Sequence, residues 1–182
     1  MPPSAEEAAL ALREIAAIRE RAAGFQDYRA ESSQLLVWGC AYIIGFTLSA
    51  LFPQYLLLVW LPVVAAALGG GALVARRSSR AVPGIAWRYL ALIGSIILFC
   101  VLIHWVVWPI SPEQGGMIAP LLIGTLFLLR GVMLRPRYLV IGGGLIGVSL
   151  LGYHLFHAIF WWWMAFAFGG GVLLSGCWLR RF

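Results

Sequence analysis

Apolar runs separated by short polar connections make up most of the chain. Four of them, 34–52, 55–75, 87–108 and 117–134, are each close to the length at which an α-helix crosses the ~30 Å hydrocarbon core of a bilayer. A helix satisfies its own backbone hydrogen bonds in lipid, whereas an isolated strand does not. The pattern therefore predicts transmembrane helices over these four ranges.

The last apolar run, 138–179, is too long for one crossing. Its 42 residues carry no charge, and as one helix they would extend about 63 Å at ~1.5 Å per residue. That length is roughly twice the hydrocarbon thickness, so the run has to turn back once. The polar-tolerant segment near its middle, 152–155, predicts the turn and divides the run into spans over 138–152 and 156–179.

The arginines orient these six spans. All thirteen basic residues are arginine, and those beyond residue 33 lie in or beside the connections after the second, fourth and sixth spans. The alternate connections, 53–54, 109–116 and 152–155, carry none. Under the positive-inside rule the basic connections face the cytoplasm. We therefore predict a multi-pass protein of the bacterial inner (plasma) membrane with both its N-terminus and its C-terminus in the cytoplasm.

Composition agrees with lipid as the main solvent. Hydrophobic residues make up 62% of the chain and charged residues 11%, against about 25% charged residues in a soluble domain. A net charge of +6 would also suit a nucleic-acid-binding protein. The arginines, however, lie at the ends of apolar runs, which is typical of membrane topology, so we expect no nucleic-acid partner. The expected fold class is an all-α membrane protein with a six-helix bundle over 34–182.

Residues 1–33 predict an amphipathic cytoplasmic helix, here called the leader. Ser4 and Glu7 have capping-box spacing. Apolar residues then recur every three or four positions and give one narrow seam: Ala8, Ala11, Ile15, Ile18, Ala22 and Phe25. A helix with such a seam is marginal alone. We expect residues 5–30 to dock on the bundle, on a second copy or on a cytoplasmic protein.

Glycine-rich segments allow two interpretations. Gly142, Gly144 and Gly147 match the GxGxxG dinucleotide fingerprint, but no acidic residue follows that could hold a ribose. No cofactor is expected there. Small residues spaced by four are interpreted instead as helix-packing faces: Ala41/Gly45/Ser49, Gly143/Gly147 and Ala167/Gly171/Ser175. Similar segments at 35–39, 88–94 and 137–142 indicate either three repeated hairpins or a shared bias toward Leu, Val and Gly.

Three histidines are candidates for metal ligands. His104, His154 and His157 are predicted at the outer ends of their spans, on the same side as Glu113. Imidazole and carboxylate bind transition metals, and paired histidines can hold haem iron. Tryptophans surround the three histidines, so the alternative is an ordinary aromatic belt at headgroup depth. A metal site formed by these four residues is one hypothesis and the belt is the other.

The sequence offers little for transport or catalysis. Ion-coupled carriers keep an ionisable residue deep in the membrane, and we expect no Asp, Glu or Lys within any span. Arg130 is expected to extend to the cytoplasmic headgroups. No nucleophile elbow, HExxH motif or Walker lysine is present. These absences favour a non-enzymatic protein and leave a passive transporter or channel as an alternative.

The leader and the layout resemble a broad group of small bacterial six-span inner-membrane proteins of unknown function, some encoded beside PadR-type regulators. The resemblance lies in Glu14-Ile15, Glu20-Arg21 and Phe25, followed at once by the first span. It implies a regulatory or stress-linked membrane protein. Our functional hypothesis is a non-enzymatic sensor, interaction or regulatory subunit. The alternatives are a haem- or metal-binding redox protein that uses the outer histidines and a passive transporter or channel.

Overall fold

The protein folds into six long helices that lie side by side. The computed structural model describes residues 12–14, 28–78, 85–133 and 136–181, and these residues form helices and turns without any strand. Five spans are single helices: α2 (Tyr28–Leu51), α3 (Leu56–Ser78), α4 (Ile85–Val106), α5 (Pro112–Met133) and α6 (Arg137–Leu155). The sixth is composite and consists of α7 (Phe160–Trp163), a π-helical segment η3 (Met164–Gly169) and α8 (Gly170–Leu179). Short 3-10 turns, η1 (Pro53–Tyr55) and η2 (His157–Ile159), precede α3 and α7.

All six helices are long and apolar enough to cross a membrane, which confirms the predicted all-helical fold and its six spans. Two predicted boundaries are wrong. The first span was predicted from residue 34, but α2 already includes 28–33, so these residues of the predicted leader belong to the helix of the first span. The fourth begins at Pro112 rather than at 117, because Ser111 and Gln114 cap it reciprocally: each accepts a hydrogen bond from the other's backbone N–H, at 3.0 and 3.2 Å.

The predicted turn in the last apolar run is confirmed within a few residues. Helix α6 continues to Leu155, and Phe156 leaves the helical conformation with φ −114° and ψ 32°. Most of the predicted leader helix, by contrast, lies outside the described residues. Of it, Leu12–Glu14 are helical with exposed side chains, and residues 28–33 form the start of α2. The predicted docking segment 5–30 therefore stays a prediction.

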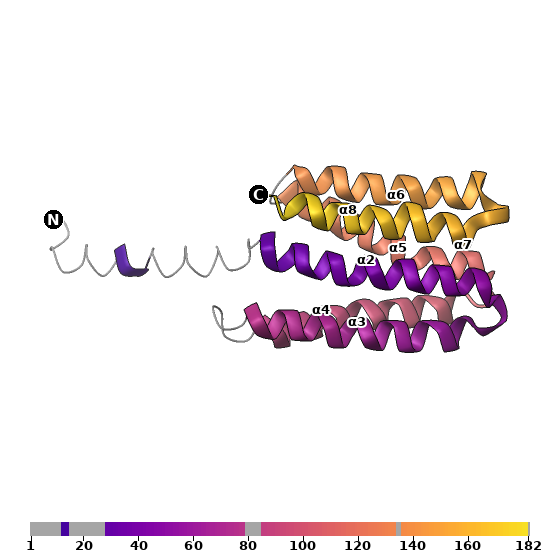
Figure 1. Ribbon diagram of the computed structural model, residues 1–182, viewed down its shortest axis with the longest axis horizontal. Helices are drawn as coiled ribbons and strands as arrows, with labels where there is room; N and C mark the ends of the chain where they lie inside the picture. The colour runs from indigo at the N-terminus through magenta and orange to yellow at the C-terminus, as the bar shows by residue number, and fades with distance from the viewer. Residues whose placement is uncertain (1–11, 15–27, 79–84, 134–135, 182) are drawn as a thin grey trace.

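The helix ends that flank the arginine-bearing connections all lie at one end of the bundle, here called the basic end. Helices α2, α4 and α6 start there, and α3, α5 and α8 finish there (Figure 1). The arginines near these helix ends include Arg76, Arg130, Arg137, Arg180 and Arg181. The sequence pattern thus corresponds to a real separation of charge along the bundle axis.

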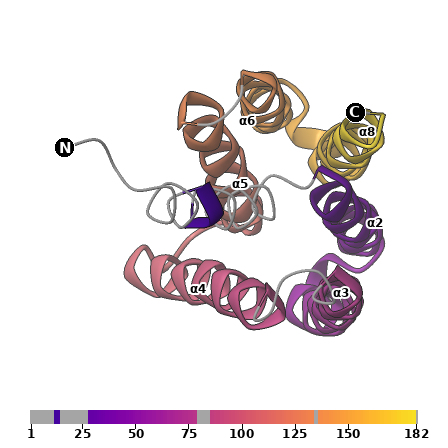
Figure 2. The same cartoon turned by 90° about the vertical axis from the view of Figure 1, so that its left-hand side faces the viewer.

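Viewed along the bundle, the helices follow one another around a ring in the order α2, α3, α4, α5, α6 and α8 (Figure 2). The packing around this ring is uneven. Helix α5 packs along the length of α6, and α2 packs closely on both α3 and α8. None of the described side chains of α4 is buried. Neighbouring helices in the ring therefore do not pack equivalently. The three-hairpin repeat stays a prediction.

An aromatic cluster forms the core between α2, α3 and the last span. Tyr42 and Phe46 of α2 are almost fully buried and contact Phe168 edge-on, with ring centroids 5.0 and 6.3 Å apart. Trp60 of α3 meets Phe46 at 5.0 Å, also edge-on. Edge-to-face pairs of this kind stabilise packing beyond simple burial. The π-helical segment places Phe168 against α2 at this point.

One predicted small-residue face is confirmed in α2. Ala41 and Ser49 are buried, and a Cβ added at Gly45 would lie 2.8 Å from the Trp60 ring. Glycine at this position therefore allows α3 to approach α2 closely.

A second predicted face, Gly143/Gly147, is wrong. A Cβ at either position would meet nothing within 4 Å, whereas a Cβ at the neighbouring Gly142 would lie 2.6 Å from the carbonyl oxygen of Gly124. The close contact between α5 and α6 thus passes through Gly124 and Gly142. It lies one residue, about 100° of helix rotation, away from the predicted stripe.

Candidate functional site at the start of α2

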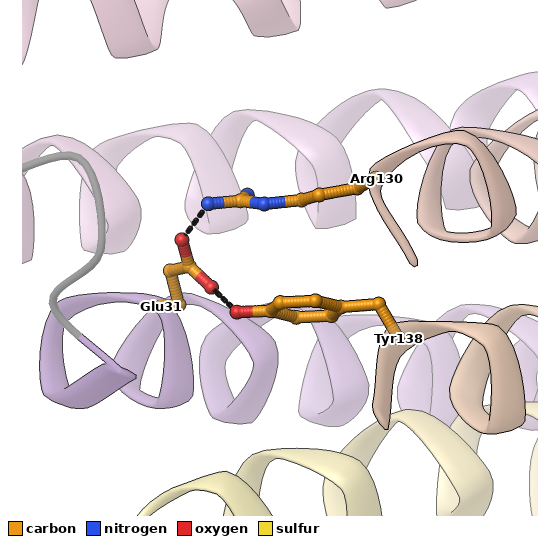
Figure 3. Close-up of polar contacts among 3 residues, drawn as sticks. All are labelled: Glu31, Arg130 and Tyr138. Carbon is orange, nitrogen blue, oxygen red and sulfur yellow. Dashed lines mark hydrogen bonds and ion pairs between the residues drawn. The ribbon is translucent and has the colours of Figure 1, made fainter. Parts of the chain in front are cut away.

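A carboxylate lies between a guanidinium and a phenol at the basic end. Arg130 near the end of α5 donates a hydrogen bond to Glu31 Oε1 in the first turns of α2, and the Tyr138 hydroxyl at the start of α6 donates to Oε2 (Figure 3). The guanidinium also lies 5.1 Å from the centroid of the Tyr138 ring, within the range of a cation–π contact. Three helices are thus joined through one acidic side chain.

This cluster corrects two expectations from the sequence. Glu31 belongs to the first spanning segment, Glu31–Leu51, and Glu113 to the fourth, Pro112–Met133, so the expectation of spans without acids is wrong. Arg130 pairs with Glu31 instead of simply reaching the headgroups. The physical reason is electrostatic. A charged side chain loses hydration near the low-dielectric hydrocarbon, and an ion pair with an opposite charge compensates for that loss.

Three more polar side chains of α2 bond to the remaining helices. Ser32 Oγ donates to the carbonyl oxygen of Gly176 in α8 at 2.8 Å. Gln34 Nε2 donates to the carbonyl oxygen of Gly71 in α3, also at 2.8 Å. The indole N–H of Trp38 donates to the Tyr89 hydroxyl at the start of α4, at 3.1 Å.

Glu31, Ser32, Gln34 and Trp38 are here called the α2 hub. Within little more than two turns, these four side chains contact all five other spanning helices at the basic end. Each hydrogen bond contributes about 0.6 kcal/mol on average inside a membrane bundle and up to about 1.7 kcal/mol. The hub is therefore a network of individually weak hydrogen bonds that connects α2 to each of the five other spanning helices.

The close packing of α3 and α4 at the hub depends on Gly71. A Cβ there would lie 1.9 Å from the Tyr89 hydroxyl and 2.7 Å from Gln34 Oε1. The Gln34 Oε1 atom is itself buried and accepts no hydrogen bond within the described structure. A buried acceptor without a donor lowers stability by about 1–3 kcal/mol, so Gln34 is the weakest member of the hub.

The predicted metal ligands lie at the opposite end of the bundle. His154 and His157 are exposed and both contact the Tyr153 ring edge-on, with centroids 5.2 and 6.2 Å apart. His104 Nδ1 lies 2.6 Å from the Cys100 carbonyl oxygen, and its Nε2 would be 3.0 Å from a Cβ at Gly115. Its ring is thus directed toward the first turn of α5.

These ligands do not gather into one centre. Among the described residues, no three His, Cys, Asp or Glu side chains lie close enough to hold a metal ion together. His154 and His157 share the Tyr153 ring, while His104 and Glu113 belong to α4 and α5. What remains of the predicted centre is a pair of exposed histidines, and haem or metal binding by that pair stays a prediction.

The GxGxxG segment lies in the middle of α6 rather than at a strand-to-helix turn, which is the context that the dinucleotide fingerprint requires. Comparisons of the chain with protein-family models, with curated proteins and with solved structures gave no match. We therefore infer the function from the geometry of the described residues.

The α2 hub was missed because the first span was predicted to start at residue 34, which placed Glu31 and Ser32 in the cytoplasmic leader. A signal was nevertheless present in the sequence. Glu31, Gln34, Trp38 and Tyr42 recur at spacings of three and four, so a helix extended upstream carries them on one face. Polar residues on one face of an otherwise apolar helix indicate contacts with other helices.

Proposed function

We propose that the protein is a non-enzymatic regulatory or interaction subunit of the bacterial inner membrane, in which the leader meets a cytoplasmic protein or a second copy. In this proposal the α2 hub transmits that contact to the bundle. The observation that carries it is the position of the hub. In the sequence the leader immediately precedes the bundle, and the first turns of α2 bond to all five other helices.

Binding at the leader has to be coupled to the arrangement of the bundle. A partner can shift a bundle between two arrangements only if it interacts differently with each of them. A displacement of the start of α2 changes one ion pair and several hydrogen bonds at once, because they all converge there. Their combined free energy, a few kcal/mol at ~0.6–1.7 kcal/mol for each hydrogen bond, is of the size of ordinary allosteric coupling, ~1–3 kcal/mol.

A site-specific crosslink tests the leader's contact. The Leu12 side chain is 68% exposed and lies beside the predicted seam, so a photoreactive residue at position 12 reports what covers it in intact cells. We expect a discrete adduct, either a dimer of this chain or one other protein. A matched probe at Met133, 81% exposed at the end of α5, should give no such adduct. Equal, diffuse labelling at both positions would contradict the proposal.

A deletion of residues 1–27 provides the second test, because it leaves α2 complete. The shortened chain should insert with all six spans and lose the adduct partner or the dimer. Unchanged association after this deletion would exclude the leader as the contact.

A passive transporter is the second candidate, and the inner face of α4 favours it. The polar side chains Tyr89, Cys100 and His104 fall among the half-buried residues of α4, while Leu92, Leu98 and Leu102 are exposed. Such a stripe could line a path for a small solute. Purified protein in liposomes should then release an entrapped neutral solute faster than protein-free liposomes, and a His104→Leu variant should slow that release.

A further inference from the structure

We propose that the groove between α6 and α8 binds one anionic phospholipid, with an acyl chain in the groove and the phosphate at the basic end. This site is separate from the leader and the α2 hub, and it goes beyond the proposed function. It requires only that the basic end lies at headgroup depth in a bilayer.

The groove is open to the side and apolar. Its volume is about 340 Å³. It is lined by Val140, Ile141, Gly144, Leu145 and Val148 from α6 and by Ala167, Gly171, Leu174, Ser175 and Trp178 from the last span. The one hydroxyl in the lining, that of Ser175, donates to the carbonyl oxygen of Gly171 at 2.7 Å. The lining is therefore almost wholly apolar, and its hydroxyl already has an acceptor.

Small residues create the groove. A Cβ at Gly144 would meet nothing within 4 Å, and one at Gly171 would meet only the Leu145 side chain, at 3.3 Å. Leu174 on the wall is 71% exposed, so the groove opens away from the bundle. Its occupant in a bilayer is apolar, narrow and supplied from the side, which fits an acyl chain.

The arginines at the basic end of the groove favour a lipid with a negatively charged headgroup. Arg137 precedes Val140 and Ile141 by three and four residues, so it lies on the groove-lining face of α6, one turn toward the basic end. Arg181 follows Trp178 by three residues, and both Arg180 and Arg181 are exposed. Basic residues beside a cleft between transmembrane helices favour anionic headgroups. The charges at the mouth therefore complement a phosphate carrying net negative charge.

A neutral lipid or a second copy fits less well. Phosphatidylcholine carries no net charge, so it is not attracted to the positive charge of Arg180 and Arg181 at the mouth. A helix from a second copy would have to enter beside the same arginines, and its own basic end would bring like charges together if the copies were parallel. An anionic phospholipid places its acyl chain in the apolar groove and its negatively charged phosphate beside the arginines at the mouth.

The test uses the full chain in detergent and one lipid at a time, with bound lipid counted by native mass spectrometry. Phosphatidylglycerol with palmitoyl and oleoyl chains is compared with phosphatidylcholine carrying the same chains. We expect one tightly held phosphatidylglycerol per chain, with weaker retention of phosphatidylcholine. Arg181→Gln should reduce that preference about fivefold, the factor expected for a single basic residue near anionic lipid.

Two glycine variants separate the groove from the rest of α6. Gly144→Leu places a side chain in the groove at a position where a Cβ meets nothing within 4 Å, and it should reduce binding of both lipids several-fold. Gly143→Leu is the matched control, because its Cβ also meets nothing within 4 Å and Gly143 is outside the lining; binding should stay unchanged. Equal retention of the two lipids by the unmodified chain, equal effects of the two glycine variants, or a change of oligomeric state in Gly144→Leu would each overturn the proposal. None of these outcomes concerns the leader.

Discussion

Breaking the Glu31–Arg130 ion pair should reveal how strongly the start of α2 is coupled to α5. The change is a double-mutant cycle of Glu31→Gln, Arg130→Gln and the two together. Glutamine at position 31 keeps the size of the side chain and one acceptor oxygen, so it removes mainly charge. The cycle thus isolates the pairwise term from the packing of each residue.

The expected coupling follows from the exposure of the two side chains. Two unit charges about 4 Å apart attract by roughly 4 kcal/mol at an effective dielectric constant of ~20. The side chains of Arg130 and Glu31 are 34% and 20% exposed, so water and salt screen part of this energy. Fully exposed pairs contribute about 0.2–1 kcal/mol, whereas loss of one partner of a buried pair costs ~3–5 kcal/mol. Between these limits we expect about 1–2 kcal/mol.

The assay is equilibrium unfolding of the full chain in mixed micelles of mild detergent and dodecyl sulfate, followed by tryptophan fluorescence. Glu113→Gln combined with Arg130→Gln is the control cycle, because Glu113 lies at the far end of α5 and the two changes should add within ~0.5 kcal/mol. A Glu31–Arg130 coupling no larger than that of the control would refute the argument that this pair fastens α2 to α5.

Further predictions concern packing, the hub and orientation. Gly142→Leu should lower the free energy of unfolding by several kcal/mol, because its Cβ meets backbone atoms of α5, whereas Gly143→Leu should be near neutral in the same micelle assay. Tyr89→Phe should remove the acceptor of the Trp38 indole and reduce stability by ~0.6–1.7 kcal/mol. An impermeant maleimide should label Ser78→Cys only from the cytoplasmic side and Glu113→Cys only from the outside, each in a background without native cysteines. Labelling of both from one side contradicts the proposed orientation.

The sequence predicts the number and length of the spans because these depend on bulk properties. Hydrocarbon thickness sets the length of each run, and the arginines mark alternate connections regardless of which helices pack together. The 42-residue run has to turn because no single helix of that length fits one bilayer, and its polar-tolerant segment 152–155 placed the turn close to Phe156.

Packing faces could not be predicted in the same way. Helix α6 is apolar on every side, so its sequence does not indicate whether Gly142 or Gly143 meets α5. The Glu31–Arg130 pair joins residues 99 positions apart, and only the three-dimensional arrangement of α2 and α5 brings them together. The hub was missed for a local reason, because Glu31 and Ser32 were assigned to the cytoplasmic leader helix rather than to the first span.

The bareness of α4 has a mechanical consequence. Lipid can replace most of what α4 touches at little cost, because apolar side chains gain almost nothing by exchanging acyl chains for other helices. The hairpin of α3 and α4 is anchored chiefly along the seam between α3 and α2. The α3–α4 hairpin is therefore the part of the bundle that can move away from α5 at the smallest cost in packing.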